Sequence, residues 1–479
     1  MASAFALCGF PFFPANALSS QFKFQRKRRA AVLARSSNVQ EPRPTKIQPP
    51  VKEKNPFPGK LEADVIVIGS GIGGLCCAGL LARYGQNVLV LESHDLPGGA
   101  AHSFEIKGYK FDSGPSLFSG FQSRGPQANP LAQVLDALGE SVPCASYDSW
   151  MVYIPEGKFL SQIGPTEFLK DLEKYVGLEA VREWKKLLVR CLLEYPLHGS
   201  GAVVDALVRG MQKFGGRLAL GTHVENILVE NGRAIGVKLR SGHIVRAKKA
   251  VVSNASMWDT LNLLPADAIP QSYQTKVKET PQCESFMHLH LGFDAQDIPE
   301  DLGIHHIVVN DWSRGVDADQ NVVLISVPSV LGKDLAPPGK HVLHAYTPGT
   351  EPFGLWEGLD RRSAEYRGLK AERSEVMWRA VERALGPGFS RENCDVKLVG
   401  TPLTHQRFLR RNRGTYGPAI KAGDATFPGH STPIPQLFCC GDSTFPGIGV
   451  PAVAASGAIV ANSLVSVSQH SELLDAVGI

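Results

Sequence analysis

The order of apolar and polar residues predicts a buried strand at the start of the main body of this chain. The segment Asp64–Ile68 is almost entirely apolar, which is typical of a strand covered on both faces. Gly69–Gly74 then predicts a turn, Leu75–Tyr84 has the spacing of a helix, and Val88–Leu91 predicts a second buried strand. Strand, glycine-rich turn, helix and strand in this order indicate a βαβ unit with parallel strands.

Further helices and strands are predicted along the middle of the chain. Helical spacing is found at Leu131–Leu138, Pro165–Leu188 and Leu207–Phe214. Short apolar runs predict strands at His223–Glu230, Ala234–Leu239 and Ala250–Ser253. Residues 281–350 hold several alternating segments, which indicate an antiparallel sheet.

The C-terminal part again places a helix after a strand. Leu437–Cys440 predicts a buried strand that stops at Gly441, and small apolar residues predict a long helix from Val450 to Val467. Pro451 and several polar residues interrupt the apolar run, and charged flanks are missing. We therefore expect this helix to pack inside the protein rather than to span a membrane.

Charge is unevenly distributed along the 479 residues. Residues 1–60 hold eleven Lys and Arg against Glu41 and Glu53, a net charge of +9, so the remainder carries −5. This leader has no acid before Glu41 and lacks the apolar block of a secretory signal. It predicts a transit peptide and linker for plastids or mitochondria; a basic tail without a targeting role is the alternative. The mildly acidic body predicts no binding to nucleic acid.

Cysteine and histidine spacing predicts neither a redox centre nor a metal site. The nine cysteines include the adjacent pairs Cys76-Cys77 and Cys439-Cys440, and no C-x-x-C occurs. His288 and His290 alternate as on a strand, but no Cys or carboxylate lies at a spacing typical of zinc ligands. We expect no metal.

The first predicted turn carries a dinucleotide-binding motif. Its sequence, Gly69-Ser70-Gly71-Ile72-Gly73-Gly74, matches G-x-G-x-x-G between a strand and a helix. Gly69 permits the tight turn, Gly71 lets the backbone approach a pyrophosphate, and Gly74 allows the helix to pack on the strand. Glu92, at the end of the second strand, is placed to accept the ribose hydroxyls. An acid at this point favours FAD or NAD over NADP.

Later residues favour FAD over NAD. Gly98-Gly99 is placed to bring the chain back past the pyrophosphate, and Gly441-Asp442 ends a strand, as a carboxylate reaching toward ribityl hydroxyls would need. The helix that begins at Gly449-Val450 is predicted to point its N-terminus at the flavin ring, where its dipole stabilises negative charge. Val224 is a further candidate contact to the cofactor.

The chain lacks two other hallmarks of flavin enzymes. It has no second G-x-G-x-x-G after a strand, which argues against a disulfide reductase with two nucleotides. It also has no Ser-Gly-Gly-Cys before the last helix, so FAD is expected to be noncovalent.

Taken together, these segments resemble phytoene-desaturase-type flavoproteins, and most of all plant carotenoid (prolycopene) isomerases and their isomerase-like relatives. The resemblance rests on Val65–Gly74, Pro97–Gly99, Tyr109–Gly114, Tyr195–Gly199, Ser253–Ala255, Thr404–Phe408, Arg413–Pro418 and Cys440–Gly447. It implies a plastid enzyme, peripheral to a membrane, that converts poly-cis lycopene to the all-trans form. It further implies reduced FAD as the active cofactor, NAD(P) only as an indirect reductant, and an apolar polyene as substrate.

Two departures from this family affect the substrate side. Relatives carry a long helical insertion between the residues that match Leu188 and Tyr195, whereas this chain has only six residues there. Ser443-Thr444 stands where the better-known isomerases have Ser-Cys. A desaturase, a flavin-free protein that binds prenylated partners as GDP-dissociation inhibitors do, and an isoform inactive through loss of its lid are the alternatives. No catalytic residue is predicted.

The predicted fold class is α/β, with a Rossmann-like FAD-binding domain and a discontinuous α+β substrate domain. The FAD-binding domain is expected to combine residues 61–120, 201–260 and 431–479, with a mostly parallel sheet. Residues 121–200 are expected to form a shortened helical lid region, and residues 261–430 the substrate domain.

Overall fold

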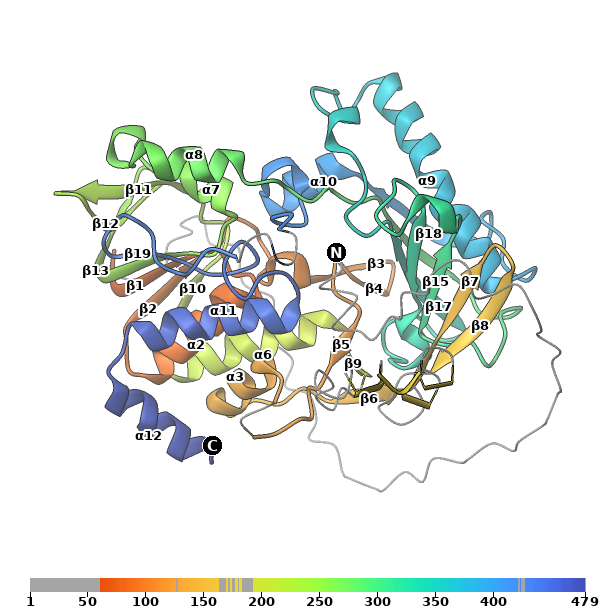
Figure 1. Ribbon diagram of the computed structural model, residues 1–479, viewed down its shortest axis with the longest axis horizontal. Helices are drawn as coiled ribbons and strands as arrows, with labels where there is room; N and C mark the ends of the chain where they lie inside the picture. Colours follow the sequence, from red (N-terminus) through yellow and green to blue (C-terminus); the bar gives the residue numbers. More distant parts are fainter. Residues whose placement is uncertain are drawn as a thin grey trace.

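The computed structural model describes residues 61–478, apart from 126–127, 163–168, 171–172, 175–176, 180, 183–192, 421–422 and 424–426. Two large sheets lie side by side in this part of the chain (Figure 1). No helix among the described residues is long and apolar enough to cross a membrane.

The first sheet is mostly parallel, as the sequence predicts. Its order is β10-β2-β1-β13-β12-β11, and β19 pairs with β13 outside this path. The strands are β1 (Glu62–Ile68), β2 (Val88–Leu91), β10 (Arg217–Ala219), β11 (Val224–Glu230), β12 (Arg233–Leu239), β13 (Ile244–Ser253) and β19 (Leu437–Cys439). β10, β2, β1, β13 and β19 are parallel, and β11 and β12 form an antiparallel hairpin beside them.

Helices cover both faces of this sheet. One face carries α2 (Ile72–Arg83), α3 (Pro130–Leu138), α6 (Ser200–Lys213) and α11 (Val450–Ser463), and the other carries α7 (Met257–Asn262) and α8 (Gln271–Glu279) (Figure 1). The continuous apolar strands explain the arrangement, because alternate residues point to opposite faces. Val65 and Val67 of β1 join the core under α2, whereas Ile66 and Ile68 join the core on the opposite face.

The second sheet is mainly antiparallel and has the order β18-β14-β17-β16-β15-β7-β8. Its strands are β7 (Ser149–Ile154), β8 (Gly157–Gln162), β14 (His288–Asp294), β15 (His305–Val309), β16 (Val322–Ser326), β17 (Lys340–Tyr346) and β18 (Cys394–Gly400). α9 (Ala364–Leu385) covers one face and buries Leu289, Leu291 and Leu343 beneath it. Only β15 and β7 pair in parallel within this sheet of the described chain.

Smaller elements connect the two sheets. β3 (Ser103–Ile106) pairs with β4 (Tyr109–Asp112), and β9 (Leu193–Pro196) lies between β5 (Phe118–Ser119) and β6 (Cys144–Tyr147). α10 (Pro402–Leu409) follows β18, and α12 (Val467–Val477) ends the chain beside the first sheet's helices (Figure 1).

Two predicted helix boundaries are wrong, and hydrogen bonds that cap the helix N-termini explain both. α6 begins at Ser200 rather than Leu207, because the carboxylate of Asp112 accepts a hydrogen bond from the Ser200 backbone N–H at 2.8 Å. The last predicted helix is in fact two helices: α11 ends at Ser463, and Ser466 and Gln469 form a capping box that begins α12. Most of the predicted helix Pro165–Leu188 lies outside the described residues, as does the leader.

Candidate functional site

The carboxyl ends of the parallel strands meet at one edge of the first sheet. Ile68 pairs with Leu91 on one side and with Ser253 on the other, and Ser253 pairs with Cys439. The residues that follow these strand ends are therefore neighbours in space. This edge is where nucleotide ligands bind in open α/β sheets.

The glycine-rich turn is packed so tightly that side chains do not fit at three positions. A Cβ at Gly74 would lie 2.3 Å from the Gly69 carbonyl oxygen, and one at Gly71 would lie 2.7 Å from Nδ2 of Asn254. A Cβ at Gly73 would meet the Val453 carbonyl oxygen at 3.0 Å. α2 begins at this turn without a side-chain cap, so its first N–H groups are available to an anion.

Glu92 joins the turn to the end of β2. Its carboxylate accepts hydrogen bonds from the Ser70 backbone N–H at 2.8 Å, from Ser70 Oγ at 2.7 Å and from the His94 backbone N–H at 2.8 Å. Glu92 is buried, yet it lines the cavity described below. These bonds fix its position beside the turn, and its predicted contact to a ribose stays a prediction.

Gly98 and Gly99 return the chain to the first turn, as the sequence predicts. The Gly98 N–H donates to the Ser70 carbonyl oxygen at 3.0 Å, and Gly98 and Gly71 form a parallel β-bridge. A Cβ at Gly99 would lie 3.1 Å from Cα of Gly71. The two turns therefore form one wall of backbone.

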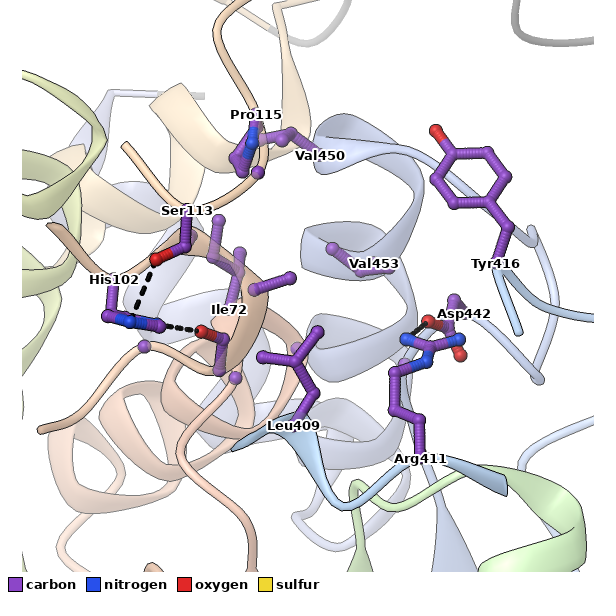
Figure 2. A pocket seen from close by; sticks show the side chains of 18 of the residues that line it. Ile72, His102, Ser113, Pro115, Leu409, Arg411, Tyr416, Asp442, Val450 and Val453 are labelled. Carbon is purple, nitrogen blue, oxygen red and sulfur yellow. Dashed lines mark hydrogen bonds and ion pairs between the residues drawn. The ribbon is translucent and has the colours of Figure 1, made fainter. Parts of the chain in front are cut away.

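The C-terminal segment completes this edge. Gly441 lies against Asn254, because a Cβ there would meet Oδ1 of Asn254 at 2.8 Å. Asp442 forms an ion pair with Arg411, whose Nε and second terminal nitrogen are buried without hydrogen-bond partners (Figure 2). α11 begins at Gly449-Val450 without a side-chain cap. The N-termini of α2 and α11, neither of which has a side-chain cap, therefore both lie among the residues that line one cavity.

A cavity of about 1040 Å³ extends from this edge to the second sheet. Every predicted cofactor residue except Ser70 and Gly74 lines it, including Val224. Figure 2 shows Ile72, Pro115, Leu409, Val450 and Val453 around part of it, with Asp442 and Tyr416 on one side. The remaining wall includes Phe286, Leu324 and Tyr346 from the second sheet region. The cavity thus has a polar backbone edge and a largely apolar body.

Histidines from the second sheet and α10 stand along this cavity. Burial lowers the pKa of His290 to about 4 and the pKa values of His305 and His405 to about 3. Burial, reinforced by neighbouring histidines, also holds the pKa values of His288 and His344 well below their usual range. All five are therefore uncharged at neutral pH, and since His288, His305 and His405 line the cavity, its wall suits an apolar ligand.

The chain belongs to the flavin-containing amine oxidoreductase family. The model of that family matches residues 168–465, and that of an NAD(P)-binding Rossmann-like domain matches residues 67–138. A chloroplastic prolycopene isomerase of Daucus carota is 31% identical over 87% of this chain and 82% of its own length. A phytoene desaturase (neurosporene-forming) of Cereibacter sphaeroides is 25% identical over 83% of this chain and 93% of its own.

The solved structures confirm the fold. An oxidoreductase from Methanosarcina mazei superposes with a TM-score of 0.59 at 19% identity, covering 84% of this chain and 100% of that one. Together these matches show an FAD-dependent enzyme of the carotenoid isomerase–desaturase type. The site fits FAD, since a glycine cradle, two uncapped helix N-termini and the unpartnered nitrogens of Arg411 face one cavity.

Sequence reasoning missed two residues at this edge. Asn254 touches the positions of Gly71, Gly73 and Gly441, and its N–H donates to the Ile68 carbonyl oxygen at 2.9 Å. It follows a buried strand, as Glu92 does, and that signal could have identified it. Arg411 pairs with Asp442 across 31 residues from a loop after α10, for which the sequence carries no pattern.

Proposed function

We propose that this chain is a plastid carotenoid isomerase that converts poly-cis lycopene to the all-trans form. The observation that carries the proposal is the cavity, which joins the nucleotide-binding edge to a largely apolar wall whose histidines are uncharged. A polyene offers no hydrogen bonds, so its binding depends on apolar area removed from water. The relatedness to prolycopene isomerases over most of the chain supports the choice of substrate.

The chain's residues hold the cofactor and keep water out. The backbone N–H groups at the start of α2 donate hydrogen bonds to the pyrophosphate. Glu92 accepts hydrogen bonds from the ribose hydroxyls, and Asp442 accepts them from the hydroxyls of the ribityl chain. The N-terminus of α11 and Arg411 favour negative charge on the flavin ring. Reduced FAD, when bound, supplies the electron density that lowers the double-bond order of the polyene and lets it rotate. NAD(P) serves only as an indirect reductant.

The substrate enters from a membrane surface in this proposal. Leu96 and Phe408 line the cavity and are 39% and 47% exposed, so apolar side chains reach the surface beside the cavity. A polyene is stored in lipid rather than in water, and exposed apolar side chains favour contact with a membrane surface. The basic leader, which has no acid before Glu41, and the chloroplastic relatives support a plastid location.

Product analysis tests the proposed reaction. The purified protein is incubated without oxygen with poly-cis lycopene and either reduced or oxidised FAD, and the carotenoids are separated. We expect all-trans lycopene of unchanged mass with reduced FAD and no conversion with oxidised FAD. Products that lack two hydrogens would instead show a desaturase, the second candidate, which the similarity to a phytoene desaturase favours.

A further inference from the structure

Three buried histidines gather on the face of the second sheet opposite α9, beside the partly buried His405 of α10. His288 and His290 alternate along β14 with Leu289 and Leu291, and the leucines join the core under α9. The antiparallel register places His344 of β17 directly opposite His290. The ring centroid of His405, from α10, lies 4.4 Å from that of His288.

The hydrogen bonds within this group leave several buried nitrogens unused. Nδ1 of His288 and Nε2 of His344 lie 3.3 Å apart. The other ring nitrogens of these two residues, His288 Nε2 and His344 Nδ1, have no hydrogen-bond partner, and neither does His405 Nε2. Buried polar atoms are nearly always satisfied in native proteins, so three open nitrogens show that the protein alone does not satisfy this cluster.

The tautomer of the third histidine, His290, is fixed by a hydrogen bond to the backbone. Nε2 of His290 lies 3.1 Å from the Asp112 carbonyl oxygen, which can only accept, so this nitrogen carries the proton. Nδ1 of His290 is then unprotonated and free to bind. A hydrogen bond from a ligand's second nitrogen to a backbone carbonyl is the usual support of a metal-binding histidine. Asp112 is itself held by Tyr195 and Ser200, at 2.5 and 2.8 Å.

Distances within the group match the coordination sphere of a small divalent ion. One nitrogen from each of His288, His290 and His344 lies within 4.8 Å of the other two. Tetrahedral zinc with bonds of about 2.0–2.1 Å places its ligand nitrogens about 3.3 Å apart, which is the separation between Nδ1 of His288 and Nε2 of His344. These two nitrogens are therefore the coordinating pair, and the open Nε2 of His288 and Nδ1 of His344 carry the ring protons. The rings of His290 and His344 are stacked at 4.7 Å, so binding must tilt them toward a common point.

We propose that His288, His290 and His344 form a binding site for one divalent transition-metal ion of the zinc class. Three neutral imidazoles select zinc, cobalt or copper over magnesium or calcium, which prefer oxygen ligands. His288 and the neighbouring His405 also line the cavity, so the proposed site borders the cavity. The site is independent of the proposed isomerase activity, because it rests on no assumption about the substrate.

Cobalt binding tests the site in the full chain with FAD bound. The protein is dialysed against a chelator and titrated with Co²⁺, whose four-coordinate bands are read at wavelengths longer than flavin absorption. We expect one Co²⁺ per chain, displaced by Zn²⁺. His344→Gln should weaken this binding at least tenfold. His305→Gln is the matched control, because His305 is similarly buried in the same sheet, on β15, but lies outside the three-histidine group.

A second variant keeps the test decisive if His344→Gln does not fold. His344→Cys retains a ligand, so its Co²⁺ complex should gain a thiolate-to-metal absorption band that the original chain lacks. Retained FAD reports that each variant is folded. Absence of stoichiometric Co²⁺ binding, or equal binding by His344→Gln and His305→Gln, would overturn the site and leave the histidines as a neutral hydrogen-bonded group. A failed isomerase assay would not affect this result.

Discussion

At the scale of single residues, Glu92 shows which features of a binding site the local sequence pattern can predict. Its place after a buried strand predicts its position at the nucleotide edge, and the register of β1 and β2 puts it there. The pattern could not show that Ser70 binds the same carboxylate, because that contact depends on the path of the turn. Arg411 was missed for a related reason, since its partner Asp442 is remote in sequence.

Replacing Glu92 tests its assigned contact to the cofactor. Glu92→Ala should weaken FAD binding by about 1–3 kcal/mol, since charge-assisted hydrogen bonds to the ribose are lost. Glu92→Gln keeps one acceptor and should lose less. The measurement is the FAD dissociation constant, with far-UV circular dichroism as the check on folding because Ser70 also loses its partner. Equal FAD affinity in all three proteins would contradict the assignment.

His306 provides a pH-dependent prediction at the same scale. Burial lowers its pKa to about 4, and its Nε2–H donates to the Gly303 carbonyl oxygen at 2.9 Å. Between pH 6.5 and 4 the unfolded chain therefore binds a proton that the folded chain does not, so stability falls as pH falls. His306→Gln keeps a donor for Gly303 and should remove about 2 kcal/mol of the stability difference between pH 7 and pH 5. Denaturant unfolding at both pH values measures this; identical pH dependence in both proteins would refute it.

At the scale of elements, periodicity located the strands and helices of the first sheet, because each is buried in a regular repeat. It failed where remote residues decide a boundary. Asp112, which caps α6, precedes Ser200 by 88 residues. Similarly, the histidine group needs the pairing of β14 with β17, so spacing along the chain does not reveal the group.

The close contact between α2 and α11 depends on Gly457. A Cβ at this position would lie 2.2 Å from the Gly73 carbonyl oxygen, so Gly457→Ala must push the helix away from the glycine-rich turn. We expect a loss of about 1–3 kcal/mol of stability and weaker FAD retention. Gly368→Ala is the control, because a Cβ there, in α9, meets nothing within 4 Å. This control should stabilise the protein slightly through helix propensity. Thermal unfolding compares the two; equal melting temperatures would show that the contact is not tight.

At the scale of the whole molecule, the cofactor edge and the substrate wall come from different parts of the chain. The edge combines β1, β2, β13 and β19, whereas the wall comes from β14 to β17 and α10. The connection between Leu188 and Tyr195, which is expected to be shorter than in relatives, is expected to affect substrate binding and not cofactor binding. The alignment with the Daucus carota isomerase spans 514 positions, more than this whole chain, although it uses 87% of it. The relative therefore has residues inside the aligned region that this chain lacks.

Because this segment is short, we expect the protein to bind FAD normally but to bind and convert poly-cis lycopene poorly. Each CH₂ of a polyene buried by a lid contributes about 0.8 kcal/mol, so a missing lid removes much of the binding energy. The FAD contacts lie outside this segment, so FAD affinity should be unchanged. The test compares this chain with a version that carries a relative's segment between Leu188 and Tyr195. The insertion should raise the rate of poly-cis lycopene conversion, mainly through a lower KM, while the FAD dissociation constant stays the same. Equal rates in both proteins would show that the substrate is held by the cavity alone and that the lid has no part in binding.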